Sequence, residues 1–206
     1  MKPIRFYLPL AAFLFSALAV VADDLNLTNF TAADVGTPAL AGTSTLAAGG
    51  VDITAGGLDI GGSSDEFHFF YQTCSNDFDV AVRVESLANS DVWAKAGLMA
   101  RETLDANSDE VSALASPTLS GCFFETRPAV GASSTLRGSF SVNYPQNWLR
   151  LRRDGDVFNG YASLDGQTWS LLGSASLSMT RPAYLGLAVS SHTTNRLTAY
   201  FWPTPR

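Results

Sequence analysis

The side chains best suited to chemistry lie on three short stretches in which polar and apolar residues alternate. If residues 91–102 form a strand, Trp93, Lys95 and Arg101 point to one side of it, because successive side chains of a strand alternate between two faces. The same argument gives two further groups: Trp148, Arg150 and Arg152 on one strand, and Asn159 and Tyr161 on another. Aromatic rings stack on the apolar face of a ligand, and cationic and amide groups donate hydrogen bonds to its oxygen atoms. These stretches therefore indicate a surface that binds a hydroxyl-rich or anionic ligand, of which glycans are the main class.

The aromatic residues also have a purely structural interpretation. Large aromatic side chains usually enter a core, so Trp93, Trp148 and Trp169, each taken singly, fit the core or its edge slightly better than a binding face. Arginines on strands can pair with glutamates of neighbouring strands instead of binding a ligand. A binding surface therefore requires that the three stretches lie side by side in one sheet.

No arrangement typical of catalysis accompanies these residues. The Glu-x-Asp-x-x-Glu spacing that supplies the two carboxylates of many glucanases is absent, as are the Gly-x-Ser-x-Gly and His-Glu-x-x-His motifs. Asp105, Asp109 and Glu110 fall in a segment with the composition of a loop, where turn chemistry explains them. His68 and His192 are the only histidines, and two imidazoles without a placed carboxylate make a poor metal site. We therefore assign no catalytic residue and no metal ligand.

Cys74 and Cys122 are the only two cysteines of the chain. In an exported protein such a pair favours a disulfide, which at this separation would stabilise the fold by about 4 kcal/mol. Two buried thiols are an equally good interpretation, because strand positions alone do not bring the two Cα atoms within bonding range. The spacing matches neither a zinc knuckle nor a redox pair.

The charge balance argues against nucleic acid as a partner. The chain has 13 basic and 19 acidic residues and a formal net charge of −6. A chain this acidic repels the phosphates of nucleic acids and of anionic lipids. No apolar stretch after the N-terminal segment approaches the length needed to cross a bilayer. We expect neither nucleic-acid binding nor a membrane span once that segment is removed.

The N-terminal segment has the three parts of a secretory signal peptide. Lys2 and Arg5 precede an apolar run that extends to Val21, and small residues end at Ala22. Cleavage after Ala22 is the preferred interpretation, with Ala19 as the alternative site. The predicted location is therefore extracellular, periplasmic or at the cell surface.

This cleavage divides the chain into a signal peptide at residues 1–22 and a single domain over residues 23–206, a length that suits one core. An uncleaved anchor is the alternative. It is disfavoured because no charged stop-transfer segment follows the apolar run.

Short strands separated by turn signals fill the rest of the chain. Asp154–Gly155 and Asp165–Gly166 each join two alternating stretches, and Asp-Gly is a strong hairpin signal because tight hairpin turns need positive φ. They predict a three-stranded meander over residues 148–173. Residues 102–110 favour a loop. With about ten to twelve strands in total, the chain is predicted to be an all-β sandwich of two sheets.

Several of these segments, taken in order, resemble a secreted domain of the concanavalin A-like lectin/glucanase superfamily, of the regulation-of-enolase type, a domain of unknown function. The segments are Asp59–Gln72, Asp77–Val80, Trp93–Glu102, Trp148–Leu151, Ser163–Trp169 and Gly186–His192, and the resemblance extends from Phe30 to Phe201. It implies a jelly-roll sandwich of two curved antiparallel sheets, one of them concave. Such domains are often attached to exported proteins that act on carbohydrates.

Calcium occurs in this superfamily, so the resemblance raises the question of a calcium site. The spacing of Asp59, Asp65, Glu66 and Asp91 is not that of a dedicated calcium loop. We therefore assign no cofactor.

The functional hypothesis is a secreted, non-catalytic, lectin-like module that binds a polysaccharide or glycoconjugate through one sheet face. Two alternatives stay open. One is a glycoside hydrolase or polysaccharide lyase of the same superfamily, with His68 or Tyr161 as the base. The other is a structural or adhesive protein of the cell surface or matrix whose exposed edge strands self-associate. The sequence indicates no particular protein partner.

Overall fold

The computed structural model describes residues 25–117, 121–140 and 146–203. The segment interpreted as a signal peptide, residues 1–22, lies outside this described part of the chain. No described segment forms a helix that is both long enough and apolar enough to cross a membrane.

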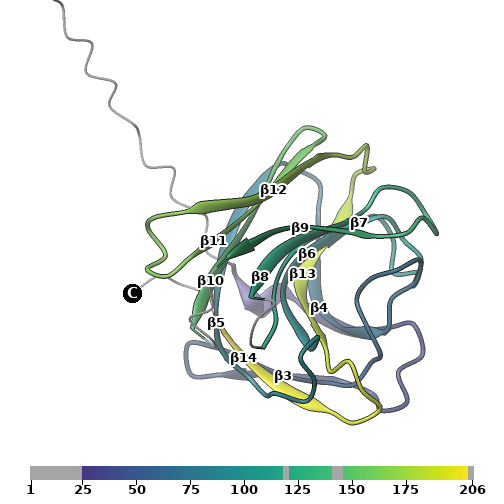
Figure 1. Cartoon of the computed structure of the whole chain (residues 1–206), viewed down its shortest axis with the longest axis vertical. Coiled ribbons are helices and arrows are strands. Elements are labelled where there is room, and N and C mark those ends of the chain that lie inside the picture. Colours follow the sequence, from purple (N-terminus) through teal and green to yellow (C-terminus); the bar gives the residue numbers. More distant parts are fainter. Residues whose placement is uncertain (1–24, 118–120, 141–145, 204–206) are drawn as a thin grey trace, which may run out of the picture.

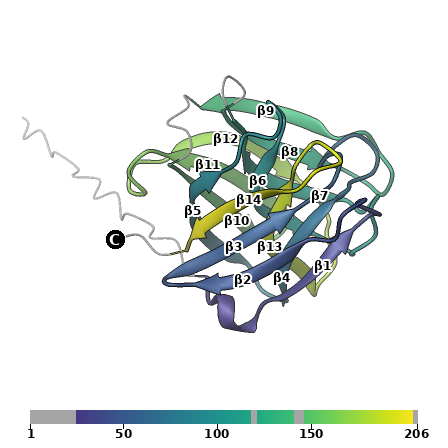
Figure 2. The same cartoon turned by 90° about the horizontal axis from the view of Figure 1, so that it is seen from below.

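The described residues contain fourteen strands, arranged as two antiparallel sheets of seven strands that lie face to face (Figure 1, Figure 2). In spatial order the first sheet contains β1 (Thr31–Val35), β4 (Phe67–Cys74), β13 (Ala183–Ser190), β6 (Lys95–Arg101), β7 (Glu110–Ala115), β8 (Cys122–Arg127) and β9 (Thr135–Phe140). The second sheet contains β12 (Ser170–Ser176), β11 (Val157–Ser163), β10 (Asn147–Asp154), β5 (Phe78–Leu87), β14 (Leu197–Trp202), β3 (Gly50–Ala55) and β2 (Thr43–Ala47). A short 3-10 helix, η1 (Leu27–Asn29), precedes β1. This arrangement confirms the predicted all-β, concanavalin A-like jelly-roll sandwich.

The predicted hairpins are present in the second sheet. β10 pairs with β11 and β11 pairs with β12, which gives the expected three-stranded meander. Gly155 and Gly166 have positive φ angles of 60° and 72°, so the Asp-Gly turns use the conformation for which glycine is suited. The predicted loop before β7 is also present, but it ends one residue earlier than expected, because Glu110 already belongs to the strand.

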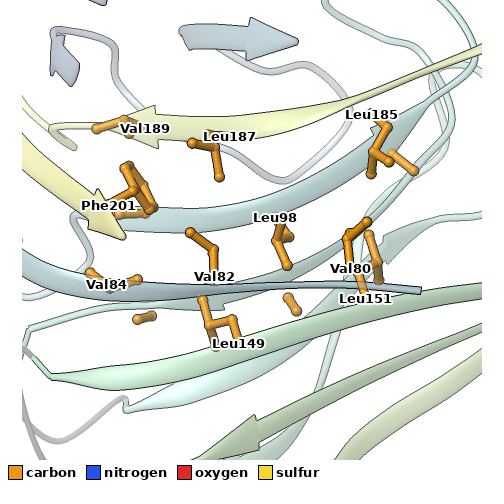
Figure 3. Packing of buried hydrophobic residues seen from close by; sticks show 14 of the residues in the cluster. Val80, Val82, Val84, Leu98, Leu149, Leu151, Leu185, Leu187, Val189 and Phe201 are labelled. Atoms are coloured by element: carbon orange, nitrogen blue, oxygen red, sulfur yellow. The ribbon is translucent and has the colours of Figure 1, made fainter. Parts of the chain in front are cut away.

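The main core lies between the two sheets and follows from strand alternation. Val80, Val82 and Val84 of β5 belong to the same apolar cluster as Leu98 of β6 and Leu187 of β13 (Figure 3). Every second residue of these strands therefore faces the opposite sheet, as the alternating sequence pattern predicts.

Phe124 of β8 fills space that two glycines leave open in this core. A Cβ atom at Gly160 of β11 or at Gly173 of β12 would lie 2.4 or 2.6 Å from ring atoms of Phe124. The two glycines face each other across the β11–β12 pair. A side chain at either position would collide with the ring, so close packing of the two sheets requires glycine there.

The first sheet is buried on its outer face as well, meaning the face that points away from the second sheet. Outward side chains such as Met99 of β6 form a second apolar cluster. Two irregular segments cover this cluster, loop 56–66 and loop 102–109. Ile60 of the former belongs to the cluster, and Leu104 of the latter packs against it. The outer face of the central strands β6, β7 and β8 is therefore an interior, whereas the edge strands β1 and β9 are mostly exposed.

Replacing Phe124 by alanine should lower the free energy of unfolding by about 3–5 kcal/mol, because neither glycine beside the ring can fill the cavity that results. Denaturant-induced unfolding followed by tryptophan fluorescence measures this change. Leu171→Ala is the matched control: Leu171 is 59% exposed, so its truncation should change the stability by less than about 0.5 kcal/mol. A Phe124→Ala variant as stable as the wild type would contradict this packing.

Candidate functional site

Lys95 and Arg101 point to the outer face of the first sheet, as strand alternation predicts, but they are buried. Arg101 is 0% exposed and Lys95 is 3% exposed. The expectation of an open polar face is wrong at these two residues, because the two covering loops supply carbonyl and carboxylate partners for them. Trp93 differs from both: it lies in a turn just before β6, not on the strand, and it is 44% exposed.

Asp65 is the centre of a buried ion-pair network on this face. Its Oδ2 accepts hydrogen bonds from Nη1 of Arg127 at 2.8 Å and from Nη1 of Arg101 at 3.2 Å, and its Oδ1 accepts from Nη2 of Arg127. All three side chains are fully buried. Arg127 also donates to the carbonyl groups of Gly62 and Ser108, one from each covering loop. The network therefore ties both loops to the sheet.

Glu110 lies at the start of β7 and is fully buried. Neither of its carboxyl oxygens has a hydrogen-bond partner among the described residues. Burial, together with the nearby carboxylates of Glu125 and Asp65, raises the pKa of Glu110 well above its usual value, which favours the protonated form. Turn chemistry does not explain this residue. The sequence signal for its burial is its spacing from Ser112 and Leu114, because these three residues point to the same face of β7.

A cavity of about 350 Å³ opens beside Lys95. Its lining consists of Asp59, Trp93, Lys95, Leu136 and His192, and we call it the Trp93 cavity. The five residues come from five separate segments: loop 56–66, the turn before β6, β6 itself, β9 and the segment after β13. Its volume lies at the lower end of the range of about 300–1,000 Å³ that is usual for small-molecule sites.

Lys95 is held by protein oxygens on every side. Its Nζ lies 2.9 Å from Oδ1 of Asp59 and 3.3 Å from Oε2 of Glu125, and it donates to the carbonyl group of Ile60. Glu125 is fully buried and also accepts a hydrogen bond from the hydroxyl of Ser134 at 2.7 Å. Burial raises the pKa of Glu125, although Lys95 opposes this shift. Because an ammonium group has three N–H donors, these oxygens match the donors of Lys95 and hold the cavity wall together.

His192 follows β13 and adopts a positive φ of 55°, which is uncommon for a residue other than glycine. Its Nδ1 lies 3.1 Å from Oδ1 of Asp91, and its Nε2 lies 4.0 Å from Oδ1 of Asp59. The same Oδ1 of Asp91 accepts a hydrogen bond from the backbone N–H of Trp93 at 2.8 Å. One carboxylate therefore positions both the imidazole and the backbone that carries the indole. The local sequence around His192 does not predict this contact with a carboxylate, because Asp91 and Asp59 are distant from it in the chain.

His68 does not share these partners. Its Nδ1 lies 2.7 Å from Oδ1 of Asp34, and its Nε2 lies 3.1 Å from the hydroxyl of Ser44. In the part of the chain that the structure describes, no group of three or more His, Cys, Asp or Glu side chains is placed to hold a metal ion.

The other five predicted binding residues lie on the second sheet. They are Trp148, Arg150 and Arg152 on β10, and Asn159 and Tyr161 on β11. The expectation that all three stretches form one stripe is wrong, because β6 belongs to the first sheet. β10 and β11 do lie side by side, with Arg150 opposite Tyr161 and the half-buried Arg152 opposite Asn159.

Arg150 is part of the second sheet's own packing. It is 6% exposed, and its Nε and Nη2 donate to the two carboxylate oxygens of Asp79, both at 2.5 Å. Its guanidinium carbon lies 5.6 Å from the ring centroid of Tyr161 and 5.5 Å from that of Trp169. Trp148 is also buried. The expectation that arginines mark an open polar face is therefore wrong for Arg150, since a carboxylate and two rings surround its guanidinium group.

Cys74 and Cys122 are free thiols, so the disulfide interpretation is wrong; the alternative of buried thiols holds for Cys122 but not for Cys74. Cys122 begins β8 inside the main core, whereas Cys74 ends β4 and is partly exposed. Burial raises the pKa of the Cys122 thiol to about 12, which keeps it protonated and unreactive at neutral pH.

Comparison with known proteins supports the fold. No family model and no curated protein sequence matches this chain. Among solved structures, a functionally unknown protein from Saccharomyces cerevisiae aligns at 17% identity over 85% of this chain and 94% of its own, with a TM-score of 0.68. The carbohydrate-binding module CBM66 from Bacillus subtilis aligns at 18% identity over 85% of this chain and 93% of its own, with a TM-score of 0.54.

An enzyme also shares the fold. The xylan beta-1,4-xylosidase from Bacillus halodurans C-125 aligns at 14% identity over 81% of this chain, with a TM-score of 0.55, but only 34% of the enzyme is covered. At such identities the likeness shows the fold alone. It supports a concanavalin A-like sandwich. It does not show that the domain is of the regulation-of-enolase type.

Asp65→Asn should lower the free energy of unfolding by about 3–5 kcal/mol, because it leaves two buried guanidinium groups without their counter-charge. Chemical denaturation measures the change. Asp77→Asn is the matched control, since the ion pair of Asp77 with Arg181 is solvent-exposed and contributes at most about 1 kcal/mol. Equal losses in the two variants would contradict the central role of Asp65.

The stability should also fall as the pH rises through the range in which Asp109 ionises. Burial and a hydrogen bond with Glu102 raise the pKa of Asp109 to about 6. Below about pH 4 both the folded and the unfolded chain hold this proton; between about pH 4 and 6 only the folded chain does, so stability is lost as the pH rises. Asp109→Asn should reduce this fall by about 1–2 kcal/mol.

Urea denaturation at a series of pH values tests this prediction, with the exposed Asp156→Asn as the control. The raised pKa of Glu110 also makes the stability fall as the pH rises, so the fall should become smaller in the Asp109→Asn variant but not vanish. A variant whose stability falls as steeply as that of the wild type would show that Asp109 is not the group responsible.

Proposed function

We propose that this chain is a non-catalytic carbohydrate-binding protein that holds a sugar in the Trp93 cavity. The observation that carries the proposal is the exposed indole of Trp93 at a cavity that also presents a carboxylate and an imidazole. An indole can cover the apolar face of a pyranose ring, while Asp59 and His192 exchange hydrogen bonds with its hydroxyl groups. Leu136, which is 48% exposed, adds apolar surface to the same cavity.

The backbone of Trp93 and the imidazole of His192 are held together before any ligand arrives. Asp91 holds the backbone N–H of Trp93 at 2.8 Å and the imidazole of His192 at 3.1 Å. Groups that are already ordered lose less conformational freedom on binding, so preorganisation favours affinity. The positive φ of His192 fits this view, because backbone strain tends to persist where function requires it.

The carboxylates near the cavity favour binding over bond cleavage. A glycosidase needs one carboxyl group as the acid and a second as the nucleophile or base. Asp59 is ion-paired with Lys95, and Glu125 is fully buried and bonded to both Lys95 and Ser134. Glu125 is inaccessible to a substrate and Asp59 is ion-paired with Lys95, so the two do not form the accessible acid and nucleophile or base that cleavage requires.

The structural comparisons are compatible with this proposal. One structural neighbour is named as a carbohydrate-binding module, and the alignment with this chain covers 93% of that module. The xylosidase also has the fold, but this chain matches only 34% of it. These names support glycan binding as a class of function, whereas the residues of the Trp93 cavity supply the site.

Export completes the proposal. We propose that residues 1–22 are a signal peptide and that residues 23–206 act as a single domain outside the cytoplasm, where polysaccharides and glycoconjugates are available. The acidic charge of the chain agrees with a partner other than nucleic acid.

Trp93→Ala should weaken glycan binding by about tenfold or more, because tryptophans at the centre of a site commonly dominate the binding energy. A glycan array identifies a ligand for the wild type, and calorimetric titration then gives the affinity of each variant. Trp169→Ala is the matched control, since Trp169 lies beside the second sheet and contacts Arg150 there. Equal affinity of Trp93→Ala and wild type would refute the site. Release of reducing ends from a polysaccharide by the wild type would show an enzyme instead.

A further inference from the structure

We propose that the Trp93 cavity selects a sugar that carries a protonated amino group and discriminates against uronate and sulfated sugars. This inference rests on the proposed glycan binding and adds the charge of the ligand to it. It reverses the preference for anionic ligands that the lysine and arginines suggest in the sequence.

The basic residues at the site have no free charge to offer. Lys95 is the one lysine in the lining of the cavity, and its Nζ is surrounded by Asp59, Glu125 and the carbonyl group of Ile60. Arg101 and Arg127 are both paired with Asp65 and fully buried. A carboxylate or sulfate in the cavity would therefore have to compete with protein carboxylates that these cations already bind.

Among the described residues, no arginine lines the Trp93 cavity. Arg137 follows Leu136 on β9, but successive side chains of a strand point to opposite faces. Leu136 pairs with Glu125 and Arg137 pairs with Phe124, so the guanidinium group of Arg137 is directed away from the cavity.

The acidic residues, in contrast, keep exposed oxygen. The side chain of Asp59 lines the cavity and is 40% exposed, although its Oδ1 is buried. The side chain of Asp91 is 35% exposed, and that of Glu125 lies beneath at 0%. Three carboxylates thus lie beside one lysine and one histidine, so acidic side chains outnumber basic ones at the site.

An amino sugar satisfies both kinds of surface in the cavity. Its ammonium group can donate to the carboxylate of Asp59, and a cation near an indole gains a further attraction from the ring's π electrons. The ring carbons of the same sugar stack on Trp93. A neutral sugar makes the stacking contact alone, and a uronate adds repulsion from Asp59 and Asp91.

The test compares three β-1,4-linked tetramers that share one backbone, made of glucosamine, glucose and glucuronate, by calorimetric titration of the full chain at pH 6. We expect the glucosamine tetramer to bind about three- to fivefold more tightly than the glucose tetramer, because a single half-exposed charge pair contributes about this much affinity. The glucuronate tetramer should bind most weakly. The glucosamine advantage should shrink as salt is added, because salt screens an exposed pair.

Asp59→Asn should bring the glucosamine-to-glucose affinity ratio close to one, and Asp156→Asn, an equal charge change on the β10–β11 turn, should leave the ratio unchanged. If Asp59→Asn fails to fold, the loss of the glucosamine advantage with added salt in the wild-type chain still tests the inference. Equal binding of glucosamine and glucose tetramers, or tightest binding of glucuronate, would overturn the inference, whereas Trp93-dependent binding of glucose tetramer would leave the proposed function standing. Binding of none of the three overturns the inference as well, and the glycan array then decides whether the proposed function also falls.

Discussion

The burial of Asp65 between Arg101 and Arg127 is the constraint on which the outer face of the first sheet depends. A charged side chain removed from water costs several kcal/mol unless a partner compensates it, and here both oxygens of Asp65 meet guanidinium nitrogens. The remaining N–H groups of Arg127 reach carbonyl groups of both covering loops. The charge pairs act together with backbone hydrogen bonds, such as Asp65 N–H to Ala106 O and Glu66 N–H to Asp59 O, to position these loops and with them Asp59 at the Trp93 cavity.

The two faces of β6 show how one strand serves stability and the site together. Its inward residues are small and apolar, which lets the second sheet approach closely, whereas its outward residues include Lys95, Met99 and Arg101. Arg101 secures the loops at one end of the strand. Lys95 at the other end binds Asp59 and Glu125 and so forms a wall of the cavity. A cationic side chain in a strand can thus be structural even where the sequence pattern indicates a binding face.

Local patterns in the sequence were sufficient for the fold but not for the site. Alternation and the two Asp-Gly turns predicted the strands, the meander and the inward residues, because these depend on neighbours within a few positions. The burial of Lys95, Arg101 and Arg150 depends on carboxylates thirty or more residues away in the chain, which no local pattern reveals. The same holds for His192. Its partner Asp91 precedes β6 and its partner Asp59 lies in the loop before β4, and the pairing of β13 with both strands brings these segments together.

A sheet that is buried on both faces restricts where a ligand can bind. The interior face meets the second sheet, and over β6, β7 and β8 the outer face is filled by loops and ion pairs, so a ligand reaches these strands only where covering segments leave a gap. The Trp93 cavity is such a gap, bounded by β6 with the turn before it, loop 56–66, β9 and the segment after β13. Of the eight residues predicted to bind a ligand, only Trp93 and Lys95 line it, and Lys95 is already engaged. The character of the site is therefore set by an indole and by carboxylates, and this is why its ligand preference differs from that suggested by a count of basic residues on strands.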